Sequence, residues 1–362
     1  MTGQQQRIVV LGAGYAGLGA ARRLASKARG AAITVVDTRA EFVERVRLHQ
    51  AAAGQSIRRW DLRELLEHKG VEFVRAQVTA LDPVAKQVYL DGEWAIGYDT
   101  LVYALGSAAD RAGVPGVAEY AHSVAVPEDI RALPAGPVVV VGAGSTGIEL
   151  AAELAESHRD SRVTLLGSEE PGSWLSARAA EHIRTTLTAL GVEIRSGVKV
   201  AEVLPEGVRL VDGTVLPAAA VVWTAGFTVP DLARRAGLDV DEQGRIRTDA
   251  TLRSISHPAI YAAGDAALID GPGDRPLRMA CATALPAGAY VAKAIMARAD
   301  GIEPKPMTFR YQLQCVSLGR RDAVIQFLHA DDSPATRVVR GRTGAWVKER
   351  IVRFAGRAAG LR

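Results

Sequence analysis

The sequence predicts an α/β protein with two similar three-layer domains and a small α+β domain at its C-terminal end. Two observations predict this class. A strand, a glycine-rich turn and a helix recur in the same order in residues 7–37 and 137–166. The two glycine turns stand 130 residues apart, which gives each of them a domain of ordinary size. The 362 residues leave room for a third, smaller domain.

The first unit reads RIVVL, then GAGYAG, then a helix rich in alanine and arginine, then a strand that ends at Asp37. In a Rossmann-like, dinucleotide-binding domain, Gly12 permits the tight turn, Gly14 lets the backbone approach a pyrophosphate, and Gly17 lets helix and strand pack closely. Asp37 stands where a carboxylate accepts a hydrogen bond from a ribose hydroxyl. The residues expected at this first nucleotide are Gly12, Ala13, Gly14, Tyr15, Ala16, Gly17, Asp37, Thr38 and Arg39.

The second unit reads PVVVV, then GAGSTG, then a helix and the strand RVTLL. Twenty residues after its last glycine stands Gly167, where the first unit has its acid, and Ser168, Glu169 and Glu170 follow. A carboxylate at that place would repel the 2′-phosphate of NADPH, so the hypothesis is use of both donors with a preference for NADH. The loop residues expected at the second nucleotide are Gly142, Gly144, Ser145, Thr146 and Gly147. Two dinucleotides in one chain indicate electron transfer between them.

Four further segments carry a family resemblance: GYDTLVYALGS (97–107), VPG (114–116), VVWTAGF (221–227) and AIYAAGD (259–265). Together with the two glycine loops, they resemble the pyridine nucleotide–disulfide oxidoreductase superfamily. Within it the chain looks most like type II NADH dehydrogenases and NAD(P)H:quinone oxidoreductases. The resemblance implies FAD as cofactor and NADH, NADPH or both as co-substrate. The remaining cofactor contacts that it implies are Val78, Ala104, Leu105, Gly106, Gly264, Asp265 and Leu285 for FAD, and Ser168, Ala225 and Gly226 for the nicotinamide nucleotide.

The order of these segments predicts the domain limits. The FAD-binding domain is expected to be discontinuous, with residues 1–112 and 228–300, and the NAD(P)H-binding domain to be inserted as residues 113–227. Residues 301–362 are expected to form the C-terminal domain. Each large domain is expected to have helices on one face of a parallel sheet and a smaller strand layer on the other.

Two residues are candidates for proton transfer. Glu149 lies just inside the second nucleotide-binding helix, and in the relatives such a glutamate projects toward the flavin and the nicotinamide. A carboxylate favoured by the positive end of the helix dipole is the alternative interpretation. His49 follows the first unit, and a proton donor and a solvent-facing helix histidine both stay open. The family's redox cysteine pairs are absent, because Cys281 and Cys315 match neither pattern.

The electron acceptor is therefore expected to be a molecule that takes electrons directly from the flavin, and the resemblance implies a quinone-like or other small molecule. The helix after the second flavin segment lacks the glutamines that line the quinone tunnel of type II NADH dehydrogenases, which weakens the respiratory interpretation. Two alternatives stay open: a reductase of an electron-carrier protein such as a ferredoxin, and a non-catalytic flavoprotein that senses NAD(P)H. No metal site and no nucleic-acid partner are expected, whereas a homodimer stays open.

The net charge of +4 is distributed unevenly. Eight lysines or arginines but only one acid, Glu349, lie in residues 334–362. On a helical wheel, an apolar face and flanking cations point to a basic amphipathic helix in residues 344–362 that lies on an anionic membrane surface. A helix packed on its own protein or on a dimer mate is the alternative. With two cysteines and no apolar run long enough for a transmembrane helix, the expected location is cytoplasmic or peripheral on the inner face of the membrane. The expected apolar face is Val347, Ile351, Phe354, Ala355, Ala358 and Leu361, flanked by Lys348, Arg350, Arg353 and Arg357.

Overall fold

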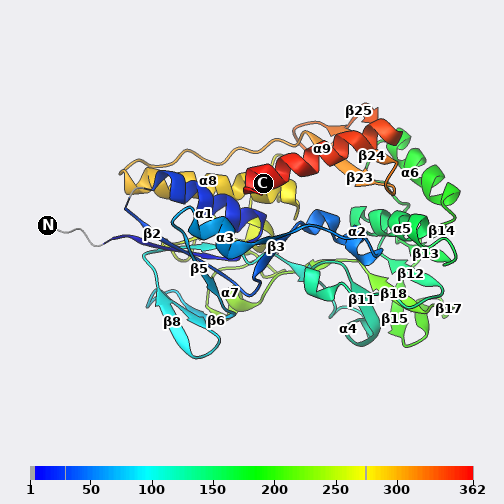
Figure 1. Cartoon of the computed structure of the whole chain (residues 1–362), viewed down its shortest axis with the longest axis horizontal. Coiled ribbons are helices and arrows are strands. Elements are labelled where there is room, and N and C mark those ends of the chain that lie inside the picture. Colours follow the sequence, from blue (N-terminus) through cyan, green and yellow to red (C-terminus); the bar gives the residue numbers. More distant parts are fainter. Residues whose placement is uncertain (1–4, 29, 274, 362) are drawn as a thin grey trace.

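The structure is a computed structural model that describes residues 5–28, 30–273 and 275–361. Two domains, each built on a parallel sheet, lie side by side, and the C-terminal helix lies over their junction (Figure 1). The predicted class, two Rossmann-like α/β domains with a small α+β C-terminal domain, is confirmed. The first four residues and Arg362, which belong to the predicted terminal domains, lie outside the described residues.

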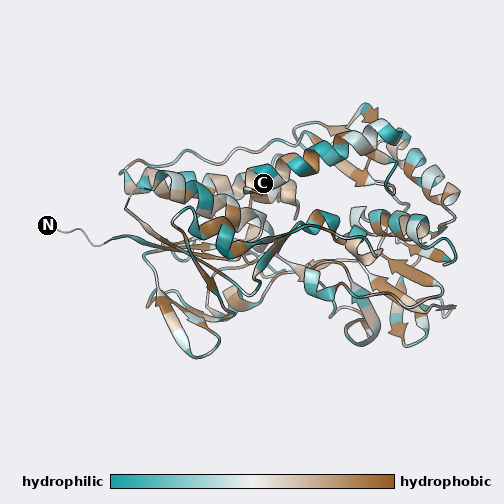
Figure 2. Cartoon of the chain, in the orientation of Figure 1, coloured by the Kyte–Doolittle hydropathy of each residue, from teal (hydrophilic) through white to brown (hydrophobic). Residues whose placement is uncertain are grey.

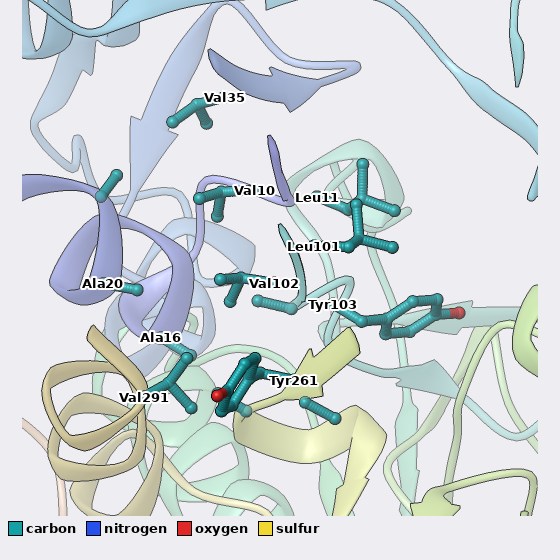
Figure 3. Packing of buried hydrophobic residues seen from close by; sticks show 14 of the residues in the cluster. Val10, Leu11, Ala16, Ala20, Val35, Leu101, Val102, Tyr103, Tyr261 and Val291 are labelled. Carbon is teal, nitrogen blue, oxygen red and sulfur yellow. The ribbon is translucent and has the colours of Figure 1, made fainter. Parts of the chain in front are cut away.

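The first domain is built on a parallel sheet in the order β21-β9-β1-β2-β5. Its strands are nearly continuous runs of apolar residues, as expected for a sheet that is covered on both faces. Helices α1 and α8 cover one face, and the antiparallel sheet β6-β7-β8 lies on the other (Figure 1). Figure 3 shows Val10, Val35 and Val102 of the sheet packed toward Ala16 and Val291 of the two helices. The elements are β1 (Arg7–Leu11), α1 (Tyr15–Lys27), β2 (Ala32–Asp37), β5 (Glu72–Arg75), β6 (Val78–Asp82), β7 (Gln87–Leu90), β8 (Trp94–Gly97), β9 (Thr100–Tyr103), β21 (Ile260–Ala262) and α8 (Cys281–Ala299).

The second domain repeats this plan with a parallel sheet in the order β11-β18-β12-β13-β14. Helices α5 and α6 lie on one face and the antiparallel sheet β15-β16-β17 on the other (Figure 1). The four valines of β12 are all buried, since they occupy the centre of this sheet. The elements are β11 (Ala121–Ser123), β12 (Val138–Val141), α5 (Ser145–Ser157), β13 (Val163–Leu166), α6 (Ala177–Ala189), β14 (Glu193–Arg195), β15 (Val200–Leu204), β16 (Gly207–Leu210), β17 (Val215–Pro217) and β18 (Ala220–Trp223).

The chain passes between the two domains twice, and the two passages are joined. Strand β10 (Ala108–Ala109) leads out of the first domain and pairs antiparallel with β19 (Phe227–Thr228), which leads back. An ion pair between Arg39 and Glu128, with 2.6 Å between nitrogen and oxygen, also bridges the two domains. The remaining elements of both domains are β3 (Glu41–Val43), η1 (Arg45–Arg47), α2 (Leu48–Ala52), β4 (Arg59–Asp61), α3 (Leu62–Glu67), α4 (Val117–Tyr120), η2 (Pro127–Asp129), α7 (Leu232–Arg235), β20 (Ile246–Arg247), η3 (Gly264–Ala266) and β22 (Ala267–Leu268).

The C-terminal domain is an antiparallel sheet, β23-β24-β25, that carries helix α9 (Gly341–Ala359). The helix packs closely on the sheet. A methyl group added at Gly344 would lie only 2.2 Å from the carbonyl oxygen of Ala323, which shows how near the two elements are. Beyond the sheet, α9 continues across to α1 and α8 of the first domain (Figure 1). The strands are β23 (Leu313–Ser317), β24 (Ala323–Leu328) and β25 (Pro334–Val339).

The predicted apolar face of the C-terminal helix is wrong in part. Phe354 is 72% exposed, whereas the side chain of Lys348 is turned inward and is 12% exposed. The buried face of α9 is a row of small residues spaced about four apart, which lets the helix approach the protein closely, and Lys348 falls in that row. The buried members are Gly344, Val352, Gly356 and Ala359.

Figure 2 shows hydrophilic and hydrophobic residues alternating along α9. Trp346 and Phe354 are exposed there, and the guanidinium of Arg350 lies 4.6 Å from the centre of the Trp346 ring. Among the described residues, no helix has both the length and the apolar composition that crossing a membrane requires.

Candidate functional site

The first glycine loop joins β1 to α1 and requires its glycines for space. A methyl group at Gly12, whose φ is +92°, would lie 2.3 Å from the carbonyl oxygen of Ala104. One at Gly17 would lie 1.8 Å from the carbonyl oxygen of Gly12. Around Gly14, in contrast, no described atom lies within 4 Å of such a methyl group. The loop is therefore tight against its own domain and open on the side that a phosphate would approach.

Asp37 ends β2 and its carboxylate lies over this loop. One oxygen accepts a hydrogen bond from the backbone N–H of Ala13 at 2.7 Å, and the other accepts one from the N–H of Arg39 at 2.9 Å. These bonds fix the carboxylate beside the loop, and Thr38 follows it directly. Arg39 itself binds Glu128 of the second domain.

The second loop, between β12 and α5, has the same construction. A methyl group at Gly142, with φ +110°, would lie 2.7 Å from Oγ1 of Thr224, and one at Gly147 would lie 1.8 Å from the carbonyl oxygen of Gly142. Thr224 closes the loop, because its hydroxyl donates to the carbonyl oxygen of Val141 at 2.9 Å. Gly144 has the same open side as its counterpart in the first loop.

Three helices point uncapped N-termini toward these loops and the junction. In α1, α5 and α8 the N-cap residues are Gly14, Gly144 and Ala280, and no described side chain caps them or places an acid in the first turn. The N–H groups of these first turns are thus free for an anion. This arrangement fits the pyrophosphates of two dinucleotides.

Asp265 lies at the end of β21 in a short polar cluster. Its carboxylate accepts a hydrogen bond from the hydroxyl of Ser107 at 2.6 Å and lies 3.4 Å from Nη1 of Arg45. Gly264 before it has φ +75°, and a methyl group there would lie 3.1 Å from the side chain of Ala16. Burial lowers the pKa of Arg45, which Asp265 partly offsets. The sequence analysis did not select Arg45, although Glu44, Arg45 and Arg47 are three charged residues that stand shortly before His49.

Tyr15 lies beneath the first loop with its ring edge against Phe42, at 5.2 Å between ring centres. Its hydroxyl is buried and has no partner among the described residues. Burial therefore raises the pKa of this phenol well above its usual range. An unpaired buried hydroxyl is costly unless a ligand group reaches it, so this position also fits a bound dinucleotide.

Glu149 and His49 come from different domains and meet at the junction. Nδ1 of His49 lies 3.6 Å from Oε2 of Glu149, and the same carboxylate binds Nζ of Lys348 and the N–H of Ser317, the latter at 2.9 Å. Burial opposes ionisation of Glu149, but the ammonium group of Lys348 and the N–H of Ser317 outweigh it and lower its pKa. The interpretation of His49 as a solvent-facing residue is wrong, because the side chain is 3% exposed.

Burial also determines the charge of His49. It lowers the pKa of His49 to about 4, against a smaller opposing effect of Glu149. The imidazole is therefore neutral at pH 7, and Lys348 is the cation that faces Glu149. No local sequence pattern indicates a role for Lys348, which is 199 residues from Glu149.

The two cysteines lie near this junction but are poor nucleophiles. Both are free thiols. Burial raises the pKa of Cys281 to about 11 and that of Cys315 to about 12, and the negative charge of Glu149 adds to both shifts. Neither is a thiolate at neutral pH, which agrees with the absence of a redox cysteine pair.

The end of β13 explains the missing acid of the second domain. A methyl group at Gly167 would lie 2.6 Å from the side chain of Ala143 and 2.6 Å from the carbonyl oxygen of Glu169. No side chain fits there, so the carboxylate of the first domain has no counterpart at this position. Ser168, Glu169 and Glu170 follow and are exposed, and Glu169 accepts a hydrogen bond from Ser173 at 2.8 Å.

The other predicted cofactor residues lie around the two loops. Leu105 and Gly106 follow β9, and Ala225 and Gly226 follow β18 at the corresponding place in the second domain. Val78 begins β6 and packs on the edge of the core. Leu285 lies in the first turns of α8, facing Gly19 of α1. Ser145 and Thr146 begin α5, where the Ser145 hydroxyl accepts a hydrogen bond from Gln314 at 3.1 Å.

Comparison with known proteins agrees with this geometry. Residues 6–294 match the family described as pyridine nucleotide-disulphide oxidoreductase. An NADH dehydrogenase-like protein of Mycobacterium tuberculosis is 37% identical over 314 residues, which cover 78% of each chain. The type II NADH:quinone oxidoreductase of Staphylococcus haemolyticus is 28% identical over 365 residues, with 90% of each chain covered. The structure of NDH2 from Plasmodium falciparum in complex with NADH has the same fold, with a TM-score of 0.83 at 15% identity over 98% of this chain and 97% of that one.

Proposed function

The chain belongs to the pyridine nucleotide-disulphide oxidoreductase family, and from that premise we propose that it uses FAD to oxidise NADH, and more slowly NADPH, with a quinone-like small molecule as acceptor. It is an enzyme, an NAD(P)H-dependent flavin oxidoreductase similar to type II NADH:quinone oxidoreductases. One observation carries the proposal. Glu149 extends from the second glycine-loop helix to meet His49 of the first domain, so the two glycine-loop domains meet at one buried polar cluster.

The first domain supplies the residues that would hold FAD. Bound FAD would supply the two-electron redox chemistry. The N–H groups at the start of α1 suit its pyrophosphate, and Asp37 suits its ribose. In the family, an aspartate at the place of Asp265 binds the ribityl chain, and Ser107 and Arg45 would hold that carboxylate in position. The N-terminus of α8 favours negative charge on a nearby ring.

The second domain would bind the nicotinamide nucleotide on the loop from Gly142 to Gly147. Gly167 offers no carboxylate to a ribose hydroxyl and no repulsion of a 2′-phosphate. Use of both donors follows from this, and the exposed Glu169 and Glu170 favour NADH over the more negative NADPH. The measured ratio of kcat/KM for the two donors tests the preference.

The buried cluster would manage the proton that accompanies the electrons. At neutral pH His49 is neutral and Glu149 is ionised, so Lys348 is the member that carries a proton to donate. Glu149 positions the ammonium group and stabilises its charge. His49 is then a positioning residue that excludes water beside the carboxylate, a role different from both interpretations that the sequence left open, proton donor and solvent-facing residue.

Anaerobic stopped-flow mixing with NADH tests the central claim. The expected result is bleaching of the flavin absorbance, followed by recovery when a quinone is added. A protein that purifies without flavin and does not take up FAD would refute the proposal. Recovery only with a ferredoxin, at a rate that falls with salt, would support the electron-carrier alternative. Bleaching without recovery on any acceptor would support a sensor.

The outer face of α9 supports a weak membrane attachment. Trp346 and Phe354 are exposed between arginines, a combination that binds anionic lipid surfaces. Co-sedimentation with vesicles containing phosphatidylglycerol is expected at low salt and is expected to disappear at high salt. Sedimentation that is equal with neutral vesicles would contradict this mode of attachment.

A further inference from the structure

Two adjoining cavities under α9 form one groove, which we call the α9 groove. The inner cavity has a volume of about 400 Å³ and the outer one of about 550 Å³. Arg47, Gln50, Arg320 and Glu349 line both of them, so the two are continuous at these residues. These volumes are in the range of sites for small organic ligands, about 300–1,000 Å³.

The inner end of the groove reaches the buried cluster at the domain junction. Ser317 and Lys348 line it, and both bind the carboxylate of Glu149. Gln50, which also lines it, is adjacent in sequence to His49. A molecule in the inner cavity would therefore touch the groups to which the proposed function assigns proton delivery.

The lining of the groove is strongly cationic. It contains eight arginines or lysines and only two acids, Glu44 and Glu349. Those two acids are already engaged, since Arg47 lies 2.9 Å from each of them. Among the described residues, the structure shows no ion pair for Arg321 or Arg342, which line the inner cavity. The groove therefore has positive charge that its own residues leave uncompensated.

The same inner cavity has apolar walls. Ala345, Trp346 and Val352 of α9 line it beside the cations. Apolar walls suit a flat ring, and arginine side chains at the mouth suit a sulfonate or carboxylate on that ring. A neutral ring would use only the walls.

We propose that the acceptor is an aromatic two-electron acceptor that carries an anionic group, such as a sulfonated or carboxylated naphthoquinone. This inference rests on the proposed function and names its substrate class. NADH gives a hydride, which supplies two electrons and one proton, and a second proton comes from solvent through Lys348. The quinone is thereby reduced to the quinol and NADH is oxidised to NAD⁺. Arg321 and Arg342 bind the anionic group and take no part in the electron transfer.

The test compares two acceptors in three proteins. The acceptors are 1,4-naphthoquinone-2-sulfonate and the neutral 2-methyl-1,4-naphthoquinone. The proteins are the wild type, the double variant Arg321→Gln/Arg342→Gln, and the double variant Arg337→Gln/Arg340→Gln. The second pair removes the same charge from exposed residues of the C-terminal domain that do not line the groove. Because each variant is compared with the wild type for the same acceptor, the different reduction potentials of the two quinones cancel.

Arg321→Gln/Arg342→Gln is expected to raise KM for the sulfonate at least about tenfold, the effect of losing one charge-assisted hydrogen bond. It is expected to leave KM for the neutral quinone within about twofold, and Arg337→Gln/Arg340→Gln is expected to change neither. Isothermal titration with naphthalene-2-sulfonate, which accepts no electrons, is expected to show the same loss of affinity in the groove variant only.

Equal changes for both quinones, or none for the sulfonate, would overturn the inference. The proposed function is measured separately, as flavin reduction by NADH and turnover of the neutral quinone. If those proceed while the sulfonate shows no dependence on Arg321 and Arg342, only the acceptor class is wrong. If NADH does not reduce the flavin, the proposed function fails and the acceptor assignment fails with it.

Discussion

Lys348→Met tests the buried ion pair at the domain junction. The side chains of Lys348 and Glu149 are 12% and 13% exposed, so removing the cation leaves a carboxylate with little access to water. Its remaining partners are the N–H of Ser317 at 2.9 Å and His49 at 3.6 Å, and His49 is neutral at pH 7. Removing one partner of a buried pair costs about 3–5 kcal/mol. We expect about 3 kcal/mol in the free energy of unfolding, because the Ser317 hydrogen bond remains.

Urea unfolding followed by tryptophan fluorescence measures this loss. Arg353→Met is the matched control on the same helix, because its ion pair with Glu349 is 66% and 33% exposed and is worth less than about 1 kcal/mol. The double variant Lys348→Met/Glu149→Gln is expected to recover most of the loss, because a neutral amide needs no cation. Equal losses in Lys348→Met and Arg353→Met, or no recovery in the double variant, would refute the reasoning that Glu149 is charged and shielded.

Three further predictions concern His49 and the glycines. The folded pKa of His49 is about 4, below its ordinary 6.5. The unfolded chain therefore binds more protons than the folded one between these two pH values. The free energy of unfolding falls as pH falls through that window, by about 2 kcal/mol at pH 5. Urea unfolding of the wild type and of His49→Asn measures this loss, and an equal loss in both proteins would contradict the prediction. Gly17→Ala places a methyl group 1.8 Å from the Gly12 carbonyl oxygen and is expected to weaken FAD binding about ten- to a hundredfold. Fluorescence titration of the apoprotein measures it, and Gly19→Ala, whose methyl group would have 3.6 Å of space, is the control. Gly167→Asp is expected to weaken binding of both nicotinamide donors without creating an NADH preference, because its side chain has no room; a clean loss of NADPH use alone would show that reasoning to be wrong.

The fold could be predicted from the sequence because its signals are local. Both glycine loops, their flanking strands and their helices lie within about thirty residues each, so backbone geometry and apolar periodicity specify them. The strands predicted from RIVVL and PVVVV are found as β1 (Arg7–Leu11) and β12 (Val138–Val141). Gly12 and Gly142 have the positive φ that the turn requires.

The polar contacts of the candidate site could not be predicted in the same way. Lys348 meets Glu149 across 199 residues, and Arg45 meets Asp265 across 220. A helical wheel places Lys348 outside the apolar face of the helix, because a charged side chain is assigned to solvent unless its ion-pair partner is known. The partner comes from another domain, and only the packing of the small residues of α9 turns the lysine toward it.

The ribosome makes helix α9 after both glycine-loop domains, and this order has a consequence for biosynthesis. A nascent chain can fold both glycine loops before Lys348 has left the exit tunnel, since domains fold in the order of synthesis. During that interval Glu149 lacks the ammonium group of Lys348, and the α9 groove lacks the helix that covers it. A chain that terminates early, anywhere before α9, would keep its two nucleotide folds but have a destabilised junction, which makes it a substrate for proteolysis instead of a partly active enzyme.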